Sequence, residues 1–399
     1  METLALGLTL LSLLTWIGLL AFRGQFWRSN VRLMPVPLNI DRLPSVCAVI
    51  PARNEADLIP KTLRSICLQD YTSPFRIVLV DDRSTDQTAE IAQTTAKDAR
   101  AMSTEMGHTP PMLDVLTAEP LPEGWTGKLW AMEQGVRHAN CYAPDYYLFT
   151  DADIEHDRSN LRQLILQAER ERLDLVSLMV RLRCQSFWER LLIPAFVYFF
   201  QKLYPFEWVN EIDNPTAAAA GGCILIRREA LERIGGLKVL KNALIDDCTL
   251  AHAVKCGDDK AHYPIWLGLA RKTRSLRPYK SLWSIWNMVA RTAYTQLKYS
   301  PLLLLVTVLG MTVTYLVPPA GFMWGLLERD RFITLISLAT WLLMAFSMLP
   351  TLQLYRRSPL WGLFLPFIAF LYTLMTIDSA VRHLFGIGGN WKGRVYSQT

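Results

Sequence analysis

The chain has 399 residues, of which 51% are apolar and 20% are charged, and its formal net charge is +6. Nearly all charged residues lie between Arg23 and Lys298, whereas residues 4–22 and most of 301–381 are apolar, which predicts a polar, enzyme-sized block between membrane segments. The modest positive charge is not gathered into a dense basic tract, which argues against nucleic-acid binding.

The first apolar segment, 4–22, is preceded by Glu2 and followed by Arg23, Arg28 and Arg32. This charge order is the reverse of that in a cleavable signal peptide. Residues 1–23 are therefore predicted to form an uncleaved transmembrane anchor. Because positive charge concentrates on the cytoplasmic side of a span, the N-terminus is expected outside and the polar block in the cytosol.

Residues 45–270 alternate short apolar runs with amphipathic stretches, which predicts an α/β domain with a mainly parallel sheet. The candidate strands are 46–50, 77–80, 112–116 and 146–150, each followed by a helix-like stretch. Ser84 and Gln87 have the spacing of a capping box, which predicts a helix over 84–99.

Acidic residues follow three apolar runs, and ligands bind parallel sheets beyond the carboxyl ends of the strands. The clusters are Asp81 and Asp82, Asp151 and Asp153, and Asp246 and Asp247.

Asp151 and Asp153 are separated by one residue at the end of a predicted strand, so both carboxylates can address one hard cation. The expected cation is Mg²⁺ or Mn²⁺, which would neutralise a diphosphate leaving group. The competing interpretation of an Asp-x-Asp sequence is a solvated turn.

Asp82 stands where a carboxylate accepts hydrogen bonds from a ribose or base, although a helix cap is the alternative for the Asp81–Asp82 pair. Asp246 and Asp247 open a predicted helix, where one of them could act as a general base. Favourable interaction with the helix dipole explains the same acids equally well.

Two cations are candidates for binding phosphate. Lys128 follows Gly124 and Gly127 at the start of a predicted helix, without the spacing of a Walker P-loop. Arg291 lies in a tryptophan-bearing amphipathic stretch and could reach a diphosphate from the membrane side, or contact a lipid headgroup instead.

The stretches 187–208 and 282–297 are rich in aromatic residues and suit the headgroup layer, with ordinary core helices as the alternative. The second belongs to a predicted interfacial segment, 271–300. The predicted C-terminal membrane region, 301–381, contains three stretches long enough to cross a bilayer: 302–327, 332–354 and 360–379.

Three crossings would place the basic tail, 382–399, outside the cell, whereas its Arg382, Lys392 and Arg394 favour the cytosol. One stretch is therefore expected to be interfacial or re-entrant. Pro318 and Pro319 point to the first of the three.

The sequence Val49-Ile50-Pro51-Ala52-Arg53-Asn54-Glu55, followed by Val80-Asp81-Asp82-Arg83-Ser84-Thr85-Asp86, resembles the opening of family 2 glycosyltransferases. The resemblance covers about 45–298 and implies a GT-A fold, a nucleotide-sugar donor and inversion at the anomeric carbon. The flanking spans and Trp391-Lys392-Gly393-Arg394 extend it toward the hopene-associated and carotenoid-type membrane members.

The resemblance also implies roles for particular residues. Those that would hold the nucleotide are Pro51, Ala52, Arg53, Asn54, Glu55 and Asp82. Asp151 and Asp153 resemble the metal and diphosphate motif, and Lys128 resembles the lysine after the nucleotide pocket. Asp247, with Asp246 before it, resembles the catalytic base.

The chain departs from processive synthases because it has no Gln-x-x-Arg-Trp sequence, which favours a single transfer over polymerisation. The expected protein is an inverting, metal-dependent enzyme of the bacterial inner membrane. It would move sugar from a nucleotide-sugar, preferably a UDP-sugar, to a lipid such as a hopanoid. The alternatives are a polyprenyl-phosphate glycosyltransferase and a catalytically silent scaffold that binds nucleotide-sugars.

Overall fold

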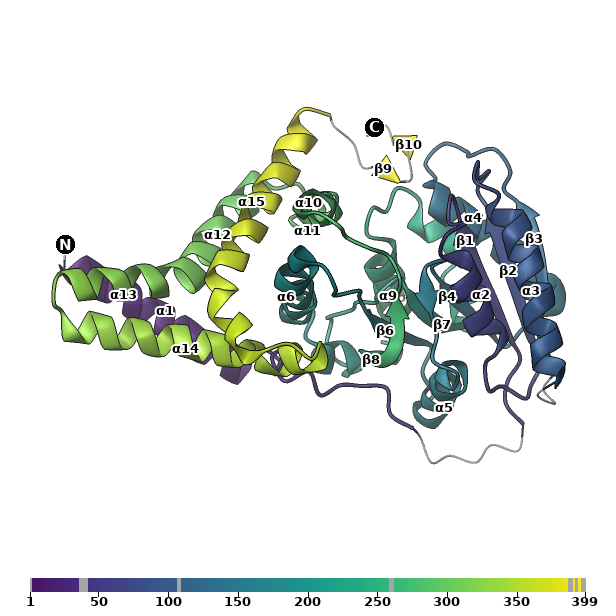
Figure 1. The fold of residues 1–399 in the computed structure, drawn as a ribbon, viewed down its shortest axis with the longest axis horizontal. Coiled ribbons are helices and arrows are strands. Elements are labelled where there is room, and N and C mark those ends of the chain that lie inside the picture. Colours follow the sequence, from purple (N-terminus) through teal and green to yellow (C-terminus); the bar gives the residue numbers. More distant parts are fainter. Residues whose placement is uncertain are drawn as a thin grey trace.

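The structure of the protein is a computed structural model that describes residues 2–35, 42–105, 109–257 and 262–386, together with the backbone of 390–391 and 394–395. Figure 1 shows a sheet-bearing part at one end of the molecule and a group of long helices that projects from it at the other. The predicted tail residue Lys392 lies outside the described residues.

The main sheet has eight strands within the described residues, in the order β3-β2-β1-β4-β7-β6-β8-β5. The strands are β1 (Val46–Ala52), β2 (Phe75–Asp81), β3 (Met112–Thr117), β4 (Tyr146–Thr150), β5 (Ile154–Glu155), β6 (Leu175–Arg181), β7 (Cys223–Arg227) and β8 (Ile265–Ser275). All four strands predicted from the sequence are present.

Strands β3, β2, β1 and β4 are parallel, whereas β7 runs antiparallel to both of its neighbours, β4 and β6. Strand β8 is parallel to β6. The carboxyl ends of β1, β2, β4, β6 and β8 therefore lie along one edge of the sheet, together with the start of β7. The mainly parallel α/β fold expected from the sequence is confirmed.

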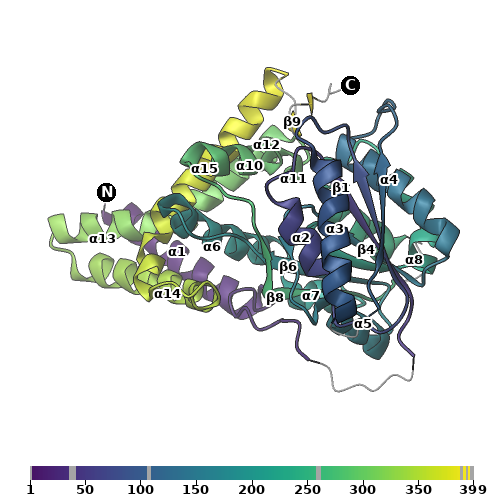
Figure 2. The same ribbon diagram turned by 45° about the vertical axis from the view of Figure 1, so that its right-hand side comes forward.

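Helices cover both faces of the sheet (Figure 2). Ala48 and Ile50 of β1 face the cluster that includes α2 (Ile59–Cys67), α3 (Thr88–Glu105) and α5 (Asn160–Glu171). Cys47 and Val49 face the other cluster, which includes α4 (Gly127–Ala139), α8 (Arg228–Arg233) and α9 (Asp246–Cys256). This alternation follows from the two-residue period of a strand, so each face of β1 is buried.

The predicted capping box at Ser84 is wrong, because α3 begins at Thr88. The side chains before the helix are engaged elsewhere: Ser84 Oγ accepts from Asn54 N at 2.9 Å, Asp86 Oδ2 from Ala56 N at 3.0 Å, and Thr88 Oγ1 from Glu55 N at 3.0 Å. These hydrogen bonds secure the loop after β1, and tertiary contacts have thus overridden the local capping signal.

Three helical segments lie between the sheet and the long apolar helices: α6 (Phe187–Leu203), α10 (Leu282–Ala290) and α11 (Ala293–Gln296), with the short α7 (Phe206–Asn210) after α6. One side of α6 is buried, including Glu189 and Tyr198, whereas Phe187 and Leu203 are exposed. The predicted segment 282–297 is divided at Arg291 and Thr292.

Four helices in the described part of the chain are long and apolar enough to cross a membrane. They are α1 (Glu2–Phe22), the continuous helix Pro301–Leu327, α14 (Arg331–Leu354) and the helix Pro359–Leu384. The second comprises α12 (Pro301–Met311), a π-helical turn (Thr312–Leu316) and α13 (Val317–Leu327). Pro318 and Pro319 therefore do not interrupt this helix, and Trp16 Nε1 donates to the Thr314 carbonyl oxygen in the π-helical turn at 2.7 Å.

The last long helix consists of a 3-10 turn (Pro359–Phe364) and α15 (Leu365–Leu384). Near its beginning, the ring of Trp361 lies 6.1 Å from that of Phe187 at the start of α6. Near its end, Asp378 Oδ2 accepts from Trp286 Nε1 of α10 at 2.7 Å. Residues near both ends of this helix therefore contact α6 and α10, and Figure 1 shows α15 beside α10.

Candidate active site

The sheet topology gathers the predicted site residues at one edge. Asp82 follows β2, Asp151 follows β4, and Glu55 lies in the loop after β1. Because β7 is antiparallel, Gly221 and Gly222 at its beginning reach the same edge. Residues far apart in the sequence can therefore converge on one ligand.

Lys128 connects two of the predicted acid clusters. Its Nζ lies 2.8 Å from Asp151 Oδ1 and 3.7 Å from Asp246 Oδ2. Thr126 caps α4 by accepting from Leu129 N, which places Lys128 in the first helical turn. Burial lowers the pKa of Lys128, but attraction to Asp151 and Asp246 outweighs it, so the net pKa is raised and the side chain stays charged.

Asp247 lies at the start of α9, where Oδ2 accepts from Gly221 N and Oδ1 from Cys248 N, both at 2.8 Å. Burial and the neighbouring charge of Asp246 raise the pKa of Asp247 to about 6, and Lys128 opposes the shift. A Cβ added at Gly221 would lie 3.3 Å from Asp247 Oδ2, so glycine leaves room for this carboxylate. A carboxylate with this pKa suits proton abstraction near neutral pH.

The loop after β1 and the end of β2 are joined through the predicted nucleotide-binding residues. Arg53 Nη1 donates to the Asp82 carbonyl oxygen at 2.5 Å and lies 3.3 Å from its carboxylate. Asn54, at φ +50°, accepts from Thr85 N at 2.9 Å. Pro51 and Ala52 belong to the buried strand β1, and the Ala52 carbonyl oxygen accepts from Asp82 N.

Arg277 is a site residue that sequence reasoning missed. Its Nη2 lies 2.6 Å from Glu55 Oε1 and its Nε lies 2.7 Å from Asp153 Oδ2. The predicted domain boundary at residue 270 falls inside β8, which continues to Ser275 and places Arg277 just beyond the edge of the sheet. An Arg-Pro pair directly after an alternating run at 271–276 was the only available signal.

Arg291, the other cation predicted from the sequence, is an exposed residue at the end of α10. Burial raises the pKa of Tyr279, and the charge of Arg291 partly offsets this rise. Arg291 therefore lies within electrostatic range of the segment that carries Arg277. It does not reach the acids of the site by any described hydrogen bond or ion pair among residues 2–35, 42–105, 109–257 and 262–386.

A second feature missed from the sequence lies beneath the Asp151–Asp153 turn. His156 is buried, with Nε2 3.0 Å from Thr150 Oγ1 and Nδ1 3.1 Å from Asn160 Nδ2. Burial lowers the pKa of His156 to about 4, so its ring is neutral at physiological pH. This neutral polar network supports the acidic turn without adding charge to it.

Part of the chain matches a known protein family. Residues 47–235 match the family model for glycosyl transferase family 2. A 4,4'-diaponeurosporenoate glycosyltransferase from Staphylococcus haemolyticus is 31% identical over 124 residues, which is 31% of this chain and 28% of that protein. The chain therefore spans little more than a quarter of the length of this relative.

A mannosyltransferase from Pyrobaculum calidifontis, solved in complex with GDP-Man and Mn²⁺, has a similar fold. The two structures align with a TM-score of 0.53 at 18% sequence identity, covering 96% of this chain and 99% of the other. The expected GT-A architecture is thereby confirmed, and the domain at residues 47–235 matches glycosyl transferase family 2.

Proposed function

We propose that the protein is an inverting, metal-dependent glycosyltransferase that transfers a sugar from a nucleotide-sugar, preferably a UDP-sugar, to a membrane lipid. The observation that carries this proposal is the position of Lys128 between Asp151 of the predicted diphosphate site and the Asp246–Asp247 pair of the predicted base. One cation thus joins the two halves of a transfer site, which a protein that only binds nucleotide does not require.

The donor atoms of the site fit a divalent cation such as Mg²⁺ or Mn²⁺. Asp151 and Asp153 offer carboxylate oxygens, and the part of the chain that the structure describes has no group of three or more His, Cys, Asp or Glu side chains that could hold a metal. Such cations are often held by one or two carboxylates plus substrate phosphates. When bound, the metal would supply Lewis-acid neutralisation of the diphosphate.

The residues of the chain then perform an in-line displacement. Asp247 takes the proton of the acceptor hydroxyl, and the hydroxyl oxygen forms a bond to the anomeric carbon. The bond between that carbon and the diphosphate oxygen breaks on the opposite face, so the configuration inverts. Lys128 shares the negative charge that develops on the nucleoside diphosphate.

The acceptor is proposed to be a membrane lipid, with a hopanoid or a related polycyclic or polyprenyl lipid as the preferred class. Support comes from α6 and α10, which lie between the sheet and the apolar helices and carry the exposed aromatic residues Phe187 and Trp283. A polyprenyl phosphate is the alternative acceptor, and exposed Arg291 is a cation that could meet its phosphate.

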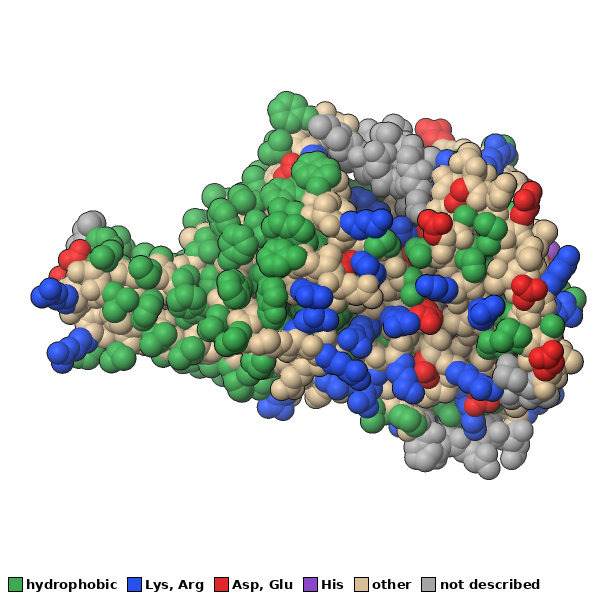
Figure 3. Space-filling view, viewed as in Figure 1, with side chains coloured by type: hydrophobic (Ala, Val, Ile, Leu, Met, Phe, Trp, Pro, Cys, Tyr) green, Lys and Arg blue, Asp and Glu red, His purple; other side chains and the backbone are tan. Residues whose placement is uncertain are grey.

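The orientation in the membrane is also proposed. Figure 3 shows apolar side chains over the projecting helices and Lys and Arg side chains gathered where these helices meet the sheet domain, which favours a cytosolic sheet domain. Because both ends of the helix Pro359–Leu384 contact α6 and α10, we propose that α1, Pro301–Leu327 and α14 cross the bilayer and that this last helix does not.

This arrangement would return the basic tail to the cytosol, which removes the conflict between the number of apolar stretches and the tail charge. A green fluorescent protein fused to the C-terminus should fluoresce in the bacterial host, while an alkaline phosphatase fusion should be inactive. Active phosphatase at this end would mean that the last helix crosses the membrane.

The function is tested by calorimetric binding of a panel of nucleotide-sugars to the purified protein in detergent, with Mn²⁺ and then with a chelator. Metal-dependent binding of one donor, followed by its transfer to a lipid extract, would establish the enzyme and identify both substrates. Donor binding without transfer to any neutral or phosphorylated lipid would favour the scaffold alternative. No binding to any donor would contradict the proposed function.

A further inference from the structure

Arg277 contacts two carboxylates that follow adjacent strands of the sheet. It joins Glu55, in the loop after β1, to Asp153, which follows β4. The side chains of these acids are only 7% and 6% exposed, whereas that of Arg277 is 34% exposed. Two adjacent carboxylates removed from water require a counter-ion, and Arg277 supplies it.

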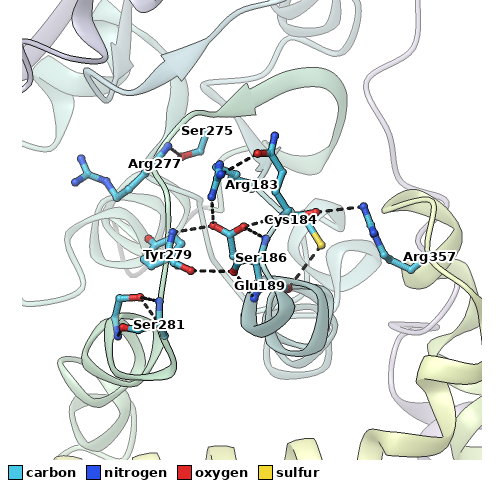
Figure 4. Close-up of polar contacts among 11 residues, drawn as sticks. Arg183, Cys184, Ser186, Glu189, Ser275, Arg277, Tyr279, Ser281 and Arg357 are labelled. Atoms are coloured by element: carbon cyan, nitrogen blue, oxygen red, sulfur yellow. Dashed lines mark hydrogen bonds and ion pairs between the residues drawn. The ribbon is translucent and has the colours of Figure 1, made fainter.

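The backbone that carries Arg277 is held on both sides. Leu276 N donates to the Asp153 carbonyl oxygen at 2.8 Å, and Tyr279 N donates to Glu189 Oε1 at 2.7 Å. In Figure 4 the guanidinium of Arg277 points away from Glu189. The segment is therefore fixed to the site on one side and to α6 on the other, so a change in the contacts of Arg277 requires rotation of its side chain only.

The Glu189 carboxylate is the anchor of this segment. It is fully buried and also accepts from Gln185 N at 2.7 Å, Ser186 N at 2.8 Å and Arg183 Nη1 at 2.6 Å. These partners saturate the carboxylate, which makes the junction in Figure 4 a rigid support.

Asp153 cannot interact fully with both Arg277 and a divalent cation. The guanidinium and the metal would carry three positive charges onto one carboxylate, and at such short distances they would repel each other. Asp151 is in a comparable position, since Lys128 lies 2.8 Å from it. Each carboxylate of the proposed metal pair is thus already neutralised by a cation of the chain.

We propose that Arg277 is a resident counter-ion that competes with the divalent cation for Asp153 and turns to the diphosphate when metal and donor bind together. This inference rests on the proposed function. It explains how the site avoids a large negative charge while empty, and it makes tight metal binding conditional on the nucleotide diphosphate, which offers the displaced guanidinium a new partner.

The test compares Arg277→Met with the wild-type protein at pH 8 in detergent. We expect Mn²⁺ alone, measured by electron paramagnetic resonance, to bind the variant about tenfold more tightly, because the competing charge is gone. The nucleotide that the wild type binds, UDP or GDP, should bind the variant about tenfold more weakly at saturating Mn²⁺. The reason is the loss of the charge-assisted contact between Arg277 and the diphosphate. The opposite directions of these two changes distinguish competition from simple damage to the site.

Arg274→Met is the matched control, because Arg274 is a neighbouring arginine that pairs with Glu155 at 2.6 Å on an exposed part of β8. It should leave both affinities unchanged. Arg277→Lys, which keeps the charge and is expected to fold if the methionine variant does not, should bind Mn²⁺ with an affinity closer to that of the wild type.

Mn²⁺ affinity in Arg277→Met that equals or falls below the wild-type value would overturn the inference and leave the proposed function intact. If Arg277→Met does not fold, Arg277→Lys decides: Mn²⁺ binding weaker than in the wild type would overturn the inference. A wild-type protein that binds no Mn²⁺, with or without nucleotide, would overturn both the inference and the metal-dependent function.

Discussion

The assignment of Asp247 as general base predicts how transfer depends on pH. With a pKa of about 6, Asp247 is about 90% ionised at pH 7 and about 9% ionised at pH 5. Only the ionised carboxylate can take the proton from the hydroxyl of the lipid. The transfer rate should therefore be near its plateau at pH 7 and fall about tenfold by pH 5. The activity is thus lost as pH falls through about 6.

The assay is transfer of labelled sugar from the donor identified by the binding panel, at saturating lipid in nanodiscs, from pH 5 to pH 9. Asp247→Asn should lower the plateau rate by about 10² to 10⁴ while donor affinity stays within about twofold. The matched variant is Asp246→Asn. It removes the like charge that raises the pKa of Asp247, so its acid limb should move below pH 6.

Two results would refute this reasoning. Wild-type turnover in Asp247→Asn would show that Asp247 is not the general base, whatever the pH profile. An acid limb that stays at the same pH in Asp246→Asn, with the wild-type limb near 6, would mean that another group is titrating.

Three further changes test the geometry around this base. Lys128→Met should weaken donor binding about tenfold, as measured by calorimetry. It should also move the acid limb of the pH–rate profile to higher pH, because Lys128 holds the pKa of Asp247 down, and an unmoved limb would contradict this electrostatic effect. Gly221→Ala, whose Cβ would meet Asp247 Oδ2 at 3.3 Å, should lower turnover about tenfold with little change in melting temperature, whereas unaltered turnover would show that the carboxylate can move aside. Glu189→Gln should lower the free energy of unfolding by about 3–5 kcal/mol in denaturant titrations, because Arg183 and three backbone N–H groups lose their charged acceptor; a change under about 1 kcal/mol would argue against a rigid junction.

The sequence was most informative where function follows local pattern. Apolar runs predicted β1, β2 and β4, and the acids that follow the second and third of these runs placed Asp82, Asp151 and Asp153 at the edge of the sheet. This succeeds because parallel neighbouring strands present their carboxyl ends together. The residue pattern offered Asp246 and Asp247 as candidate bases, and the resemblance to the family selected Asp247, whose contact with Gly221 depends on the antiparallel β7.

The failures have a common physical cause, which is that long-range contacts decide them. Ser84 has the pattern of a helix cap, yet it accepts from Asn54 across 30 residues. Arg277 belongs to a segment that looked like the start of an interfacial region, and the pairing of β8 with β6 and β5 brings it to Asp153. Contacts between residues 124 positions apart leave no periodic pattern in a single sequence.

The contacts of Lys128 imply that donor binding and base strength are coupled. Its ammonium lies against Asp151 in the donor half of the site and lowers the pKa of Asp247 in the acceptor half. A bound diphosphate attracts Lys128 and adds negative charge near Asp247, and both effects raise the pKa of that carboxylate. Under the proposed mechanism, Asp247 should therefore become a stronger base when a donor is present, provided that its pKa stays below the working pH. The acid limb of the donor-bound enzyme should accordingly lie above that of the free enzyme, and the bridging lysine coordinates the two halves of the reaction through charge alone.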